Sequence, residues 1–370
     1  KMRYRRMPIE VESPEEMGYS SIENNLSESS IWDARLGDWC KDLESLTLCY
    51  GEHRGQNELL ERIAAASGGV RAEDVLAVPG AAAALFIVNS SLLESGASML
   101  VVRPNYSTNI GTPRLLQCSM EYLDLVFEKR FELDLEEVSS RITSSTRLVS
   151  VTYPHNPTGV CLSEAKLRAL IELVERRRCY LLVDETYRDL HRGDPPPLAA
   201  SLSERAISVS SLSKAYGLPG IRMGWIVCRD PELQELFLAA KEQIVICNSV
   251  IDEEIARRVL AQREALLPEI LARVDENWQI VSQWMAGEKH LEWILPGGGV
   301  VCLPRFAGNL EINTRAFYEV LLRKFSTYVG PGHWFELSDR YFRLGYGWEP
   351  KERLARGLKN ISSAIEASLR

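Results

Sequence analysis

Short apolar runs and longer amphipathic stretches alternate along the chain from about residue 74. The runs DVLAV, SMLVV, RLVSV, YLLV, ISVS and WIV are almost continuously apolar, which is typical of strands buried on both faces. In the stretch 163–178, apolar residues recur at the spacing of a helix, at Leu167, Leu170, Ile171 and Val174. The pattern predicts an α/β fold in which helices cover both faces of a mostly parallel sheet.

The pattern changes after the last of these runs, where a second, smaller unit is expected. Residues 251–287 are predicted to form one long helix or a broken pair. Pro268 is the expected break or kink, because proline lacks the N–H that a helix interior needs. Since residues 1–45 show no clear periodicity, we predict that they pack on residues 266–370 as a small α+β domain, with 46–265 forming the large domain.

The composition is that of a folded protein with a large core, since 45% of the 370 residues are apolar and 25% are charged. The net charge is -8 and the isoelectric point is about 5.4. These values argue against nucleic acid or an anionic membrane as the main partner, because both select basic surfaces. No apolar stretch is long enough to span a bilayer, and the opening KMRYRRM is too polar for a signal peptide.

Cysteine and histidine positions indicate neither a disulfide framework nor a metal site. The eight cysteines include no CxxC pair, and several lie in or beside apolar runs, where a free thiol behaves as a small apolar side chain. We therefore expect a reduced, cytoplasmic compartment. The five histidines are scattered without an HxxxH pair, so no zinc site is expected.

Chemically distinctive side chains follow the ends of the predicted strands, where ligands bind in sheets of this kind. A helix start, an arginine and hydroxyl groups suit a phosphate. An aromatic ring, an amide, a carboxylate, a phenol and a lysine suit an aromatic carbonyl compound held as a Schiff base, and the whole set predicts pyridoxal 5′-phosphate as the cofactor. The residues are Gly80, Ala81, Ala82, Tyr106, His155, Asn156, Asp184, Tyr187, Ser211, Ser213, Lys214 and Arg222.

Three of these stretches together resemble the motifs of a known family. They are S-x-S-K-x(7)-R-x-G at 211–224, N-P-T-G at 156–159 and D-x-x-Y at 184–187, in the order of the class I/II aminotransferases. The resemblance extends from about Tyr50 to Arg343. It implies a fold-type I pyridoxal-phosphate enzyme, with the seven-stranded large domain of the aspartate aminotransferase type.

The resemblance implies roles around the ring of the cofactor. Lys214 resembles the lysine that binds the cofactor as a Schiff base and then moves the Cα proton, for which a desolvated amine is suited. Asp184 resembles the carboxylate that keeps the pyridine nitrogen protonated. Asn156 and Tyr187 resemble the pair that hydrogen-bonds the phenolic oxygen, and Tyr106 resembles the ring that stacks on the pyridine.

The phosphate end is assigned in the same way. Ser211, Ser213 and Arg222 resemble the phosphate clamp, which the backbone around Gly80 completes. Many relatives have a hydroxyl or amide side chain next to that glycine, but this chain has alanines, so only the N–H groups of Ala81 and Ala82 act there.

Arg343, with Asn156 beside it, resembles the arginine that binds the α-carboxylate of the substrate through two parallel hydrogen bonds. Tyr50 resembles the tyrosine that reaches the phosphate of a neighbouring subunit, which implies a homodimer with shared active sites. The serines of NLSESS stand where relatives usually have a glycine that contacts substrate, and they indicate an unusual substrate.

Several of these residues also have an ordinary structural interpretation. Asp184 could cap a helix, Asn156 could serve a turn before a proline, and Tyr106 could belong to the core. Arg343 could form a surface ion pair. His155 is either a packed turn residue or an additional acid–base group.

The predicted reaction is transamination, in which an L-amino acid gives up its amino group and a 2-oxo acid accepts it. No arginine occurs at 246–250, where aspartate-type relatives bind a distal carboxylate, so a dicarboxylate-only enzyme is not favoured. The same residues also support elimination, decarboxylation, ring-forming synthase chemistry or oxygen-dependent oxidation. A cofactor-sensing regulator is the non-enzymatic alternative, but Lys214 is present and the sequence shows no basic helix-turn-helix extension.

Overall fold

The computed structural model describes residues 4–94 and 96–369, so the start of the basic KMRYRRM stretch lies outside the described residues. Within these residues the largest sheet has seven strands in the order β2-β8-β7-β6-β5-β3-β4. Six of these strands overlap the apolar runs of the sequence, and the seventh, β4, is the more polar SMEYLD. The predicted α/β fold is confirmed. The strands are β2 (Val75–Val78), β3 (Ser98–Arg103), β4 (Ser119–Asp124), β5 (Thr146–Thr152), β6 (Tyr180–Asp184), β7 (Ala206–Ser211) and β8 (Gly224–Val227).

Strand direction in this sheet is uniform except at β8. β3 pairs in parallel with β4 and β5, β5 with β6, and β6 with β7, whereas β8 is antiparallel to both β7 and β2. The carboxyl ends of the other strands therefore meet at one edge, where ligands bind in such sheets. The beginning of β8 lies at this same edge, because Gly224 is opposite both Ser211 and Val78.

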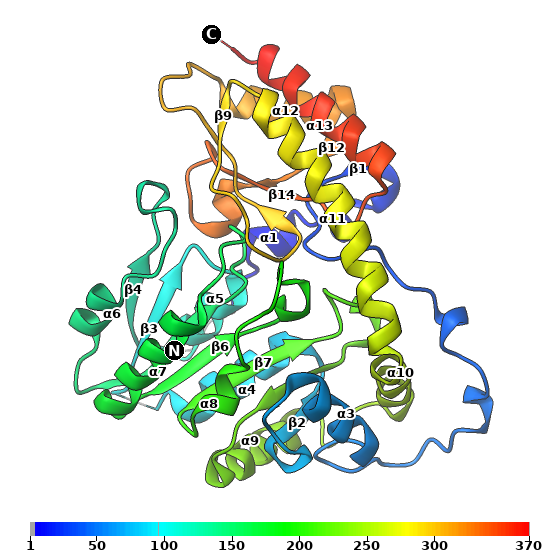
Figure 1. Cartoon of the computed structure of the whole chain (residues 1–370), viewed down its shortest axis with the longest axis vertical. Coiled ribbons are helices and arrows are strands. Elements are labelled where there is room, and N and C mark those ends of the chain that lie inside the picture. The colour runs from blue at the N-terminus through cyan, green and yellow to red at the C-terminus, as the bar shows by residue number, and fades with distance from the viewer. Residues whose placement is uncertain (1–3, 95, 370) are drawn as a thin grey trace.

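Helices cover both faces of the sheet (Figure 1). Val101 of β3 packs in the same core cluster as side chains of α4, α5 and α9, whereas its neighbours Leu100 and Val102 pack in the cluster that contains residues of α6 and α7. Successive residues of a strand point to opposite faces, so a strand covered on both faces is apolar throughout. The bounds are α4 (Gly80–Leu92), α5 (Ser107–Leu115), α6 (Leu135–Arg141), α7 (Glu164–Arg177), α8 (Ala199–Leu202) and α9 (Pro231–Ile244).

A smaller unit stands above the large sheet in Figure 1, and α11 runs from the sheet-bearing part up into it. β14 is the middle strand of a small antiparallel sheet with β10 and β13, and α11 and α12 pack on α13. The bounds are α10 (Val250–Ala261), α11 (Arg263–Gly287), β9 (Leu291–Glu292), β10 (Val301–Cys302), β11 (Arg305–Phe306), α12 (Thr314–Phe325), β12 (Thr327–Tyr328), β13 (Gly330–Pro331), β14 (Phe342–Gly345) and α13 (Lys351–Glu366).

The predicted broken pair is confirmed as α10 and α11, but a break at Pro268 is wrong, because the break falls at Gln262 and Pro268 lies inside α11. A kink at Pro268 stays a prediction. The N–H of Gln262 bonds to the Val259 carbonyl and so ends α10. The Gln262 carbonyl accepts the N–H of Ala265 and thereby begins α11. In the second turn of a helix a proline removes a single backbone hydrogen bond, and the helix continues.

The N-terminal segment connects the two parts of the molecule. It contains α1 (Pro8–Val11), α2 (Pro14–Met17) and β1 (Asn24–Asn25), and α3 (Asn57–Ser67) follows it. β1 pairs in parallel with β12 of the smaller unit, while the Ile31 N–H donates to the Lys214 carbonyl in the turn after β7 (3.1 Å). The domain boundaries at residues 45 and 265 stay a prediction.

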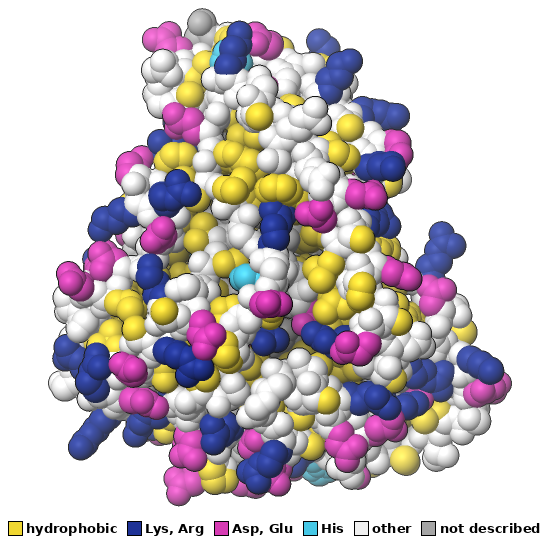
Figure 2. Space-filling view, viewed as in Figure 1, with side chains coloured by type: hydrophobic (Ala, Val, Ile, Leu, Met, Phe, Trp, Pro, Cys, Tyr) yellow, Lys and Arg dark blue, Asp and Glu magenta, His cyan; other side chains and the backbone are white. Residues whose placement is uncertain are grey.

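The charge distribution on one face and the lengths of the helices agree with the expectations from the composition. On the face drawn in Figure 2, basic and acidic side chains are interspersed, and neither sign forms a broad area. Within residues 4–94 and 96–369, no helix is both long and apolar enough to cross a membrane.

Candidate active site

One cavity at the carboxyl edge of the large sheet brings together most of the residues predicted from the sequence. Counting the space at its open mouth, it measures about 1010 Å³. The predicted residues that line it are Ala81, Ala82, Tyr106, Asn156, Asp184, Tyr187, Ser211, Ser213, Lys214 and Arg222. Ser29, one of the serines of NLSESS, also lines it, together with residues that sequence analysis missed, which are Glu15, Leu85, Thr152, Thr186 and Pro219.

Lys214 lies in the turn that follows β7, and its side chain is partly buried in this cavity. Burial lowers the pKa of the Lys214 amine. The Glu28 carboxylate opposes this effect, whereas the charges of Arg343 and Arg222 add to it. A larger fraction of the amine is therefore neutral near pH 7 than for an exposed lysine, as a nucleophilic amine requires.

Asp184 is the last residue of β6 and is held by donors on both carboxylate oxygens. Oδ1 accepts from the hydroxyl (2.6 Å) and the N–H (3.2 Å) of Thr186, so Asp184 also closes the turn after the strand. Oδ2 accepts from Nδ2 of Asn109 in α5 (3.1 Å). Asn109 in turn donates to Asn105 (3.2 Å), which also accepts from Thr152 (2.9 Å). This buried network fixes the carboxylate facing the cavity.

Asn156 is joined to Arg343, which lies deeper in the protein. Nη1 of Arg343 donates to Oδ1 of Asn156 (3.2 Å), and Nη2 donates to the Ser27 carbonyl (2.7 Å). Arg343 is 3% exposed, so it does not form the surface ion pair considered from the sequence. Among the described residues its Nε finds no acceptor. The guanidinium is thus only partly satisfied by the protein.

Tyr187 is buried, and its hydroxyl meets no hydrogen-bond partner among the described residues. Burial raises the pKa of Tyr187, so the hydroxyl stays protonated and is available as a donor. A buried donor that is left unpaired costs free energy, of the order of 1–3 kcal/mol. Because this hydroxyl belongs to a residue that lines the cavity, a bound acceptor would remove that cost.

The end of the cavity near α4 has the features of an anion site. A Cβ on Gly80 would lie 2.6 Å from Nη2 of Arg222, so only glycine allows the guanidinium to approach the helix start. Nη1 of Arg222 donates to the Ser213 hydroxyl (3.4 Å) and to the Pro219 carbonyl (2.9 Å). The first N–H groups of α4, near Ala81, add free donors at the positive end of the helix dipole.

Tyr106 lies at the start of α5, and its ring borders the cavity. Its hydroxyl donates to Oε1 of Glu10 in α1 (3.3 Å). Burial raises the pKa of Tyr106 to about 12, and the Glu10 charge acts in the same direction. The N-terminal segment therefore reaches the rim of the cavity at this tyrosine.

Tyr50 is not brought to this cavity, since it is 81% exposed on the loop before α3. A neighbouring lysine fixes that loop, because Lys241 of α9 is fully buried and its Nζ donates to the His53 carbonyl. The role of Tyr50 in a second subunit stays a prediction.

His155 does not line the cavity and is buried in the turn next to it. Its Nε2 bonds to the Pro104 carbonyl (2.7 Å), which requires a proton on that nitrogen, and Nδ1 pairs with the Thr158 hydroxyl (2.7 Å). Burial lowers the pKa of His155 to about 4, so the ring is neutral near pH 7. His155 thus joins the loops after β3 and β5 as a packed turn residue.

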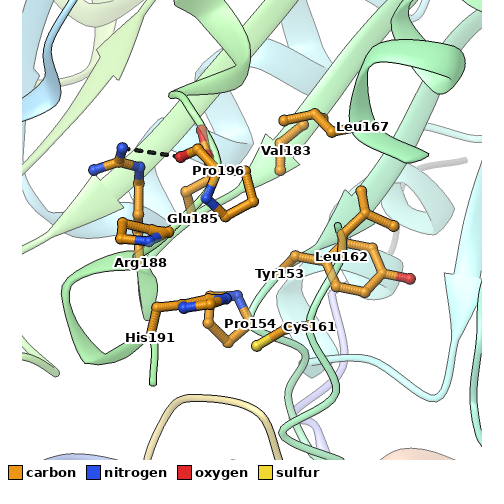
Figure 3. A pocket seen from close by; sticks show the side chains of 11 residues that line it. Tyr153, Pro154, Cys161, Leu162, Leu167, Val183, Glu185, Arg188, His191 and Pro196 are labelled. Atoms are coloured by element: carbon orange, nitrogen blue, oxygen red, sulfur yellow. Dashed lines mark hydrogen bonds between the residues drawn. The ribbon is translucent and has the colours of Figure 1, made fainter. Parts of the chain in front are cut away.

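A second, smaller cavity is lined in part by Val183 and Glu185, the chain neighbours of Asp184, and Figure 3 shows its lining. Tyr153, Leu162, Leu167 and Val183 make it largely apolar, and Arg188 donates to the Pro196 carbonyl beside it (3.0 Å). Glu185 reaches this cavity, and one of its oxygens accepts from the Ala199 N–H (3.3 Å). Burial raises the pKa of Glu185 to about 7.

Glu185→Gln should stabilise the protein above pH 7. In the unfolded chain this carboxyl ionises near its ordinary pKa of about 4.5, so the folded state binds more protons between pH 4.5 and 7 and loses stability as the pH rises. The loss amounts to about 3 kcal/mol at most, and glutamine removes it. Urea unfolding of both proteins at pH 5 and pH 8 checks this. A stability difference that does not grow with pH would contradict it.

Comparison with known proteins places this site in a family. The profile of the family described as aminotransferase class I and II matches residues 41–361. The chain belongs to this family. Within it, the chain is 30% identical to capreomycidine synthase of Streptomyces vinaceus, over 94% of this chain and 91% of that protein.

Solved structures of aminotransferase type agree with this membership. A pyridoxal-phosphate-dependent aminotransferase from Streptococcus suis superimposes with a TM-score of 0.89 at 26% identity, covering 99% of this chain and 100% of that one. A pyridoxal-phosphate-dependent cyclase superimposes with a TM-score of 0.88 at 26% identity, covering 99% of both chains. The chain is therefore a pyridoxal-phosphate enzyme of the aminotransferase family.

Pyridoxal 5′-phosphate is the cofactor, as the sequence predicts, and the residues of the cavity fit it. The unpaired Tyr187 hydroxyl and the Asn156 amide suit an anionic ring oxygen, and the fixed Asp184 carboxylate suits a protonated ring nitrogen. The close approach of Arg222 to Gly80 makes a cradle for a phosphate that a side chain at Gly80 would fill.

Proposed function

We propose that this enzyme transfers the amino group of an L-amino acid to a 2-oxo acid, with Lys214 as the residue that binds the cofactor and moves the proton. The observation that supports this best is the single cavity in which a lysine of lowered pKa shares the lining with Asp184 and Arg222. When bound, the cofactor supplies an aldehyde carbon for the amine and a ring that accepts electron density from the substrate Cα.

Three groups would hold the cofactor. Arg222, Ser211 and Ser213, with the first N–H groups of α4, bind the phosphate through charge-assisted hydrogen bonds. Asp184 would pair with the ring nitrogen, and the donors on its two oxygens keep it oriented toward the cavity. Tyr187 and Asn156 hold the phenolic oxygen, while Tyr106 packs against the ring.

Lys214 and Arg343 would divide the chemistry on the substrate. Arg343 binds the α-carboxylate, for which it has a partly unsatisfied guanidinium held by Asn156 and Ser27. The lowered pKa of the Lys214 amine lets it accept the proton from Cα and return it during transfer. Which Cα bond breaks depends on how Arg343 orients the substrate relative to Lys214.

We further propose a homodimer in which Tyr50 completes the phosphate site of the other subunit. Tyr50, Leu48 and Ile246 are exposed large side chains, and His53, close to Tyr50, pairs with Glu242 near the end of α9 (2.6 Å). Exposed large side chains of this kind would be covered where a second copy of the chain contacts them.

A ring-forming synthase is the second candidate. It is favoured by the similarity of nearly the whole chain to the synthase and the cyclase described above. The two activities use the same lysine and cofactor and differ in whether a 2-oxo acid accepts the amino group.

A panel of amino acids with the purified holoprotein tests the proposal. We expect at least one L-amino acid to change the cofactor absorbance, and a 2-oxo acid to reverse this change while its amino acid counterpart forms. Mass spectrometry of the products, with ammonia and oxygen assays, is the measurement. A cyclic product with no need for a 2-oxo acid would favour the synthase. No change in absorbance with any amino acid would refute both candidates.

A further inference from the structure

The segment 26–31 is fixed beside both residues that are proposed to act on the substrate. Nη2 of Arg343 donates to the Ser27 carbonyl (2.7 Å), and the Ile31 N–H donates to the Lys214 carbonyl (3.1 Å). Within this segment Ser29 lines the cavity. The side chains of the segment therefore have fixed positions near the bound substrate.

Glu28 lies in this segment, and no arginine, lysine or histidine among the described residues forms an ion pair with it. A Cβ on Gly345 of β14 would lie 1.8 Å from the Glu28 carbonyl oxygen, so the backbone here packs tightly on the strand of Arg343. The Glu28 carboxylate accepts from Nδ2 of Asn25 (3.2 Å), and it takes part in no ion pair among the described residues. Burial raises the pKa of Glu28, and the charges of Lys214 and Arg343 oppose this rise.

Glu15 of α2 lines the cavity itself, whereas Glu28 is the chain neighbour of the lining residue Ser29. Glu15 is likewise in no ion pair among residues 4–94 and 96–369. The cationic groups of the site are already assigned, with Lys214 and Arg222 to the cofactor and Arg343 to the α-carboxylate. Glu15 and Glu28 have no cationic partner among the described residues, so the part of the substrate beyond its α-carboxylate lies in a region of negative charge. Such a field repels a distal carboxylate and attracts a distal cation.

An aromatic pair stands beside the two carboxylates. The rings of Tyr19 and Trp348 are stacked, with centroids 5.8 Å apart and planes 18° from parallel, and Tyr19 is 46% exposed. Tyr19 and Trp348 line a hollow together with Asn25, whose Nδ2 donates to Glu28, and Nε1 of Trp348 donates to Asp33 (3.1 Å). Burial raises the pKa of Tyr19, and the charges of Glu28, Glu15 and Asp33 act in the same direction. Aromatic faces combined with carboxylates bind ammonium and guanidinium groups well.

We propose that the substrate is an amino acid with a cationic side chain, an amine or a guanidinium, which Glu28 and Glu15 bind beside Tyr19. The inference rests on the proposed function, because binding of the α-carboxylate by Arg343 determines that the side chain of the substrate faces Glu28. It also explains the NLSESS segment, in which Glu28 and its neighbours replace the glycine that the family resemblance implies.

Pairs of amino acids that differ in charge but little in shape test the proposal. L-arginine is compared with L-citrulline, and L-lysine with L-norleucine, by titrating the holoprotein and following the cofactor absorbance at low ionic strength. We expect one or both cations to bind at least about tenfold more tightly than the neutral partner, as a charged hydrogen bond provides. Glu28→Gln should reduce this preference to about twofold, with neutral ligands changed by less than about twofold.

Glu16→Gln is the matched control, because Glu16 also lies in α2 but pairs with Arg6 (2.8 Å) outside the cavity. It should keep the full preference, whereas Glu15→Gln should lower it. A preference for arginine alone assigns a guanidinium, and one for lysine alone an amine. Equal binding of charged and neutral members, or an equal loss of both in Glu28→Gln, overturns the inference. If no amino acid changes the absorbance, the proposed function fails as well, which is a distinct result.

Discussion

Lys214→Ala should reduce turnover by about 10⁴-fold or more, since it removes both the nucleophilic amine and the group that moves the proton. The cavity offers no substitute, because Lys214 is the lysine among its lining residues. The cofactor should still bind through Arg222, Asp184 and the helix start, but without a covalent bond. Steady-state kinetics with the best amino acid of the panel measure the loss of activity, and reduction with borohydride followed by peptide mass spectrometry locates the covalent attachment.

The chain provides an internal control for this experiment. Lys241 is also buried, and this burial lowers its pKa to about 8. However, its Nζ donates a hydrogen bond to the His53 carbonyl, and it lies outside the cavity. After reduction of the wild-type holoprotein, the cofactor should be found on the peptide that contains Lys214 and not on the one that contains Lys241. Recovery of the cofactor on any other lysine, or substantial turnover by Lys214→Ala, would contradict the assignment.

The fold and most of the lining of the cavity could be predicted because their determinants are local in the sequence. Six of the seven strands of the large sheet are short apolar runs, and parallel strands bring their carboxyl ends to one edge. Asp184 ends one of these strands, and Asn156 and Lys214 follow others within four residues, so the sheet alone is enough to bring the three together. Arg222 joins them from the other direction, because it precedes the antiparallel strand β8.

The remaining residues could not be predicted, because distant contacts place them. Glu15 comes from a segment without periodicity, and Glu28 is held by β14, more than three hundred residues further along the chain. No spacing in the sequence indicates such a contact. The break at Gln262 instead of Pro268 has a similar origin, since hydrogen bonds around Gln262 and not a helix-breaking residue decided it.

Arg343 connects the predicted site with the segment 26–31, and its removal should affect substrate far more than cofactor. Arg343→Ala deletes the guanidinium that would bind the α-carboxylate, and loss of such a buried charge pair lowers kcat/KM by about 10²-fold or more. The affinity for pyridoxal 5′-phosphate should change by only a fewfold, because the proposed phosphate and ring contacts do not include Arg343.

Arg343→Lys separates the contribution of the two parallel hydrogen bonds to the α-carboxylate from that of the positive charge alone. Lysine keeps the positive charge but cannot form two parallel hydrogen bonds while also bonding to Asn156 and the Ser27 carbonyl, so it should recover only part of the lost kcat/KM. Titration of the apoprotein with the cofactor, and of each holoprotein with substrate, gives the two affinities separately. If both fall by the same factor in Arg343→Ala, the arginine acts mainly by fixing Ser27 and Asn156. In that case the segment containing Glu28 should loosen as well, and the preference for a cationic side chain should disappear with it.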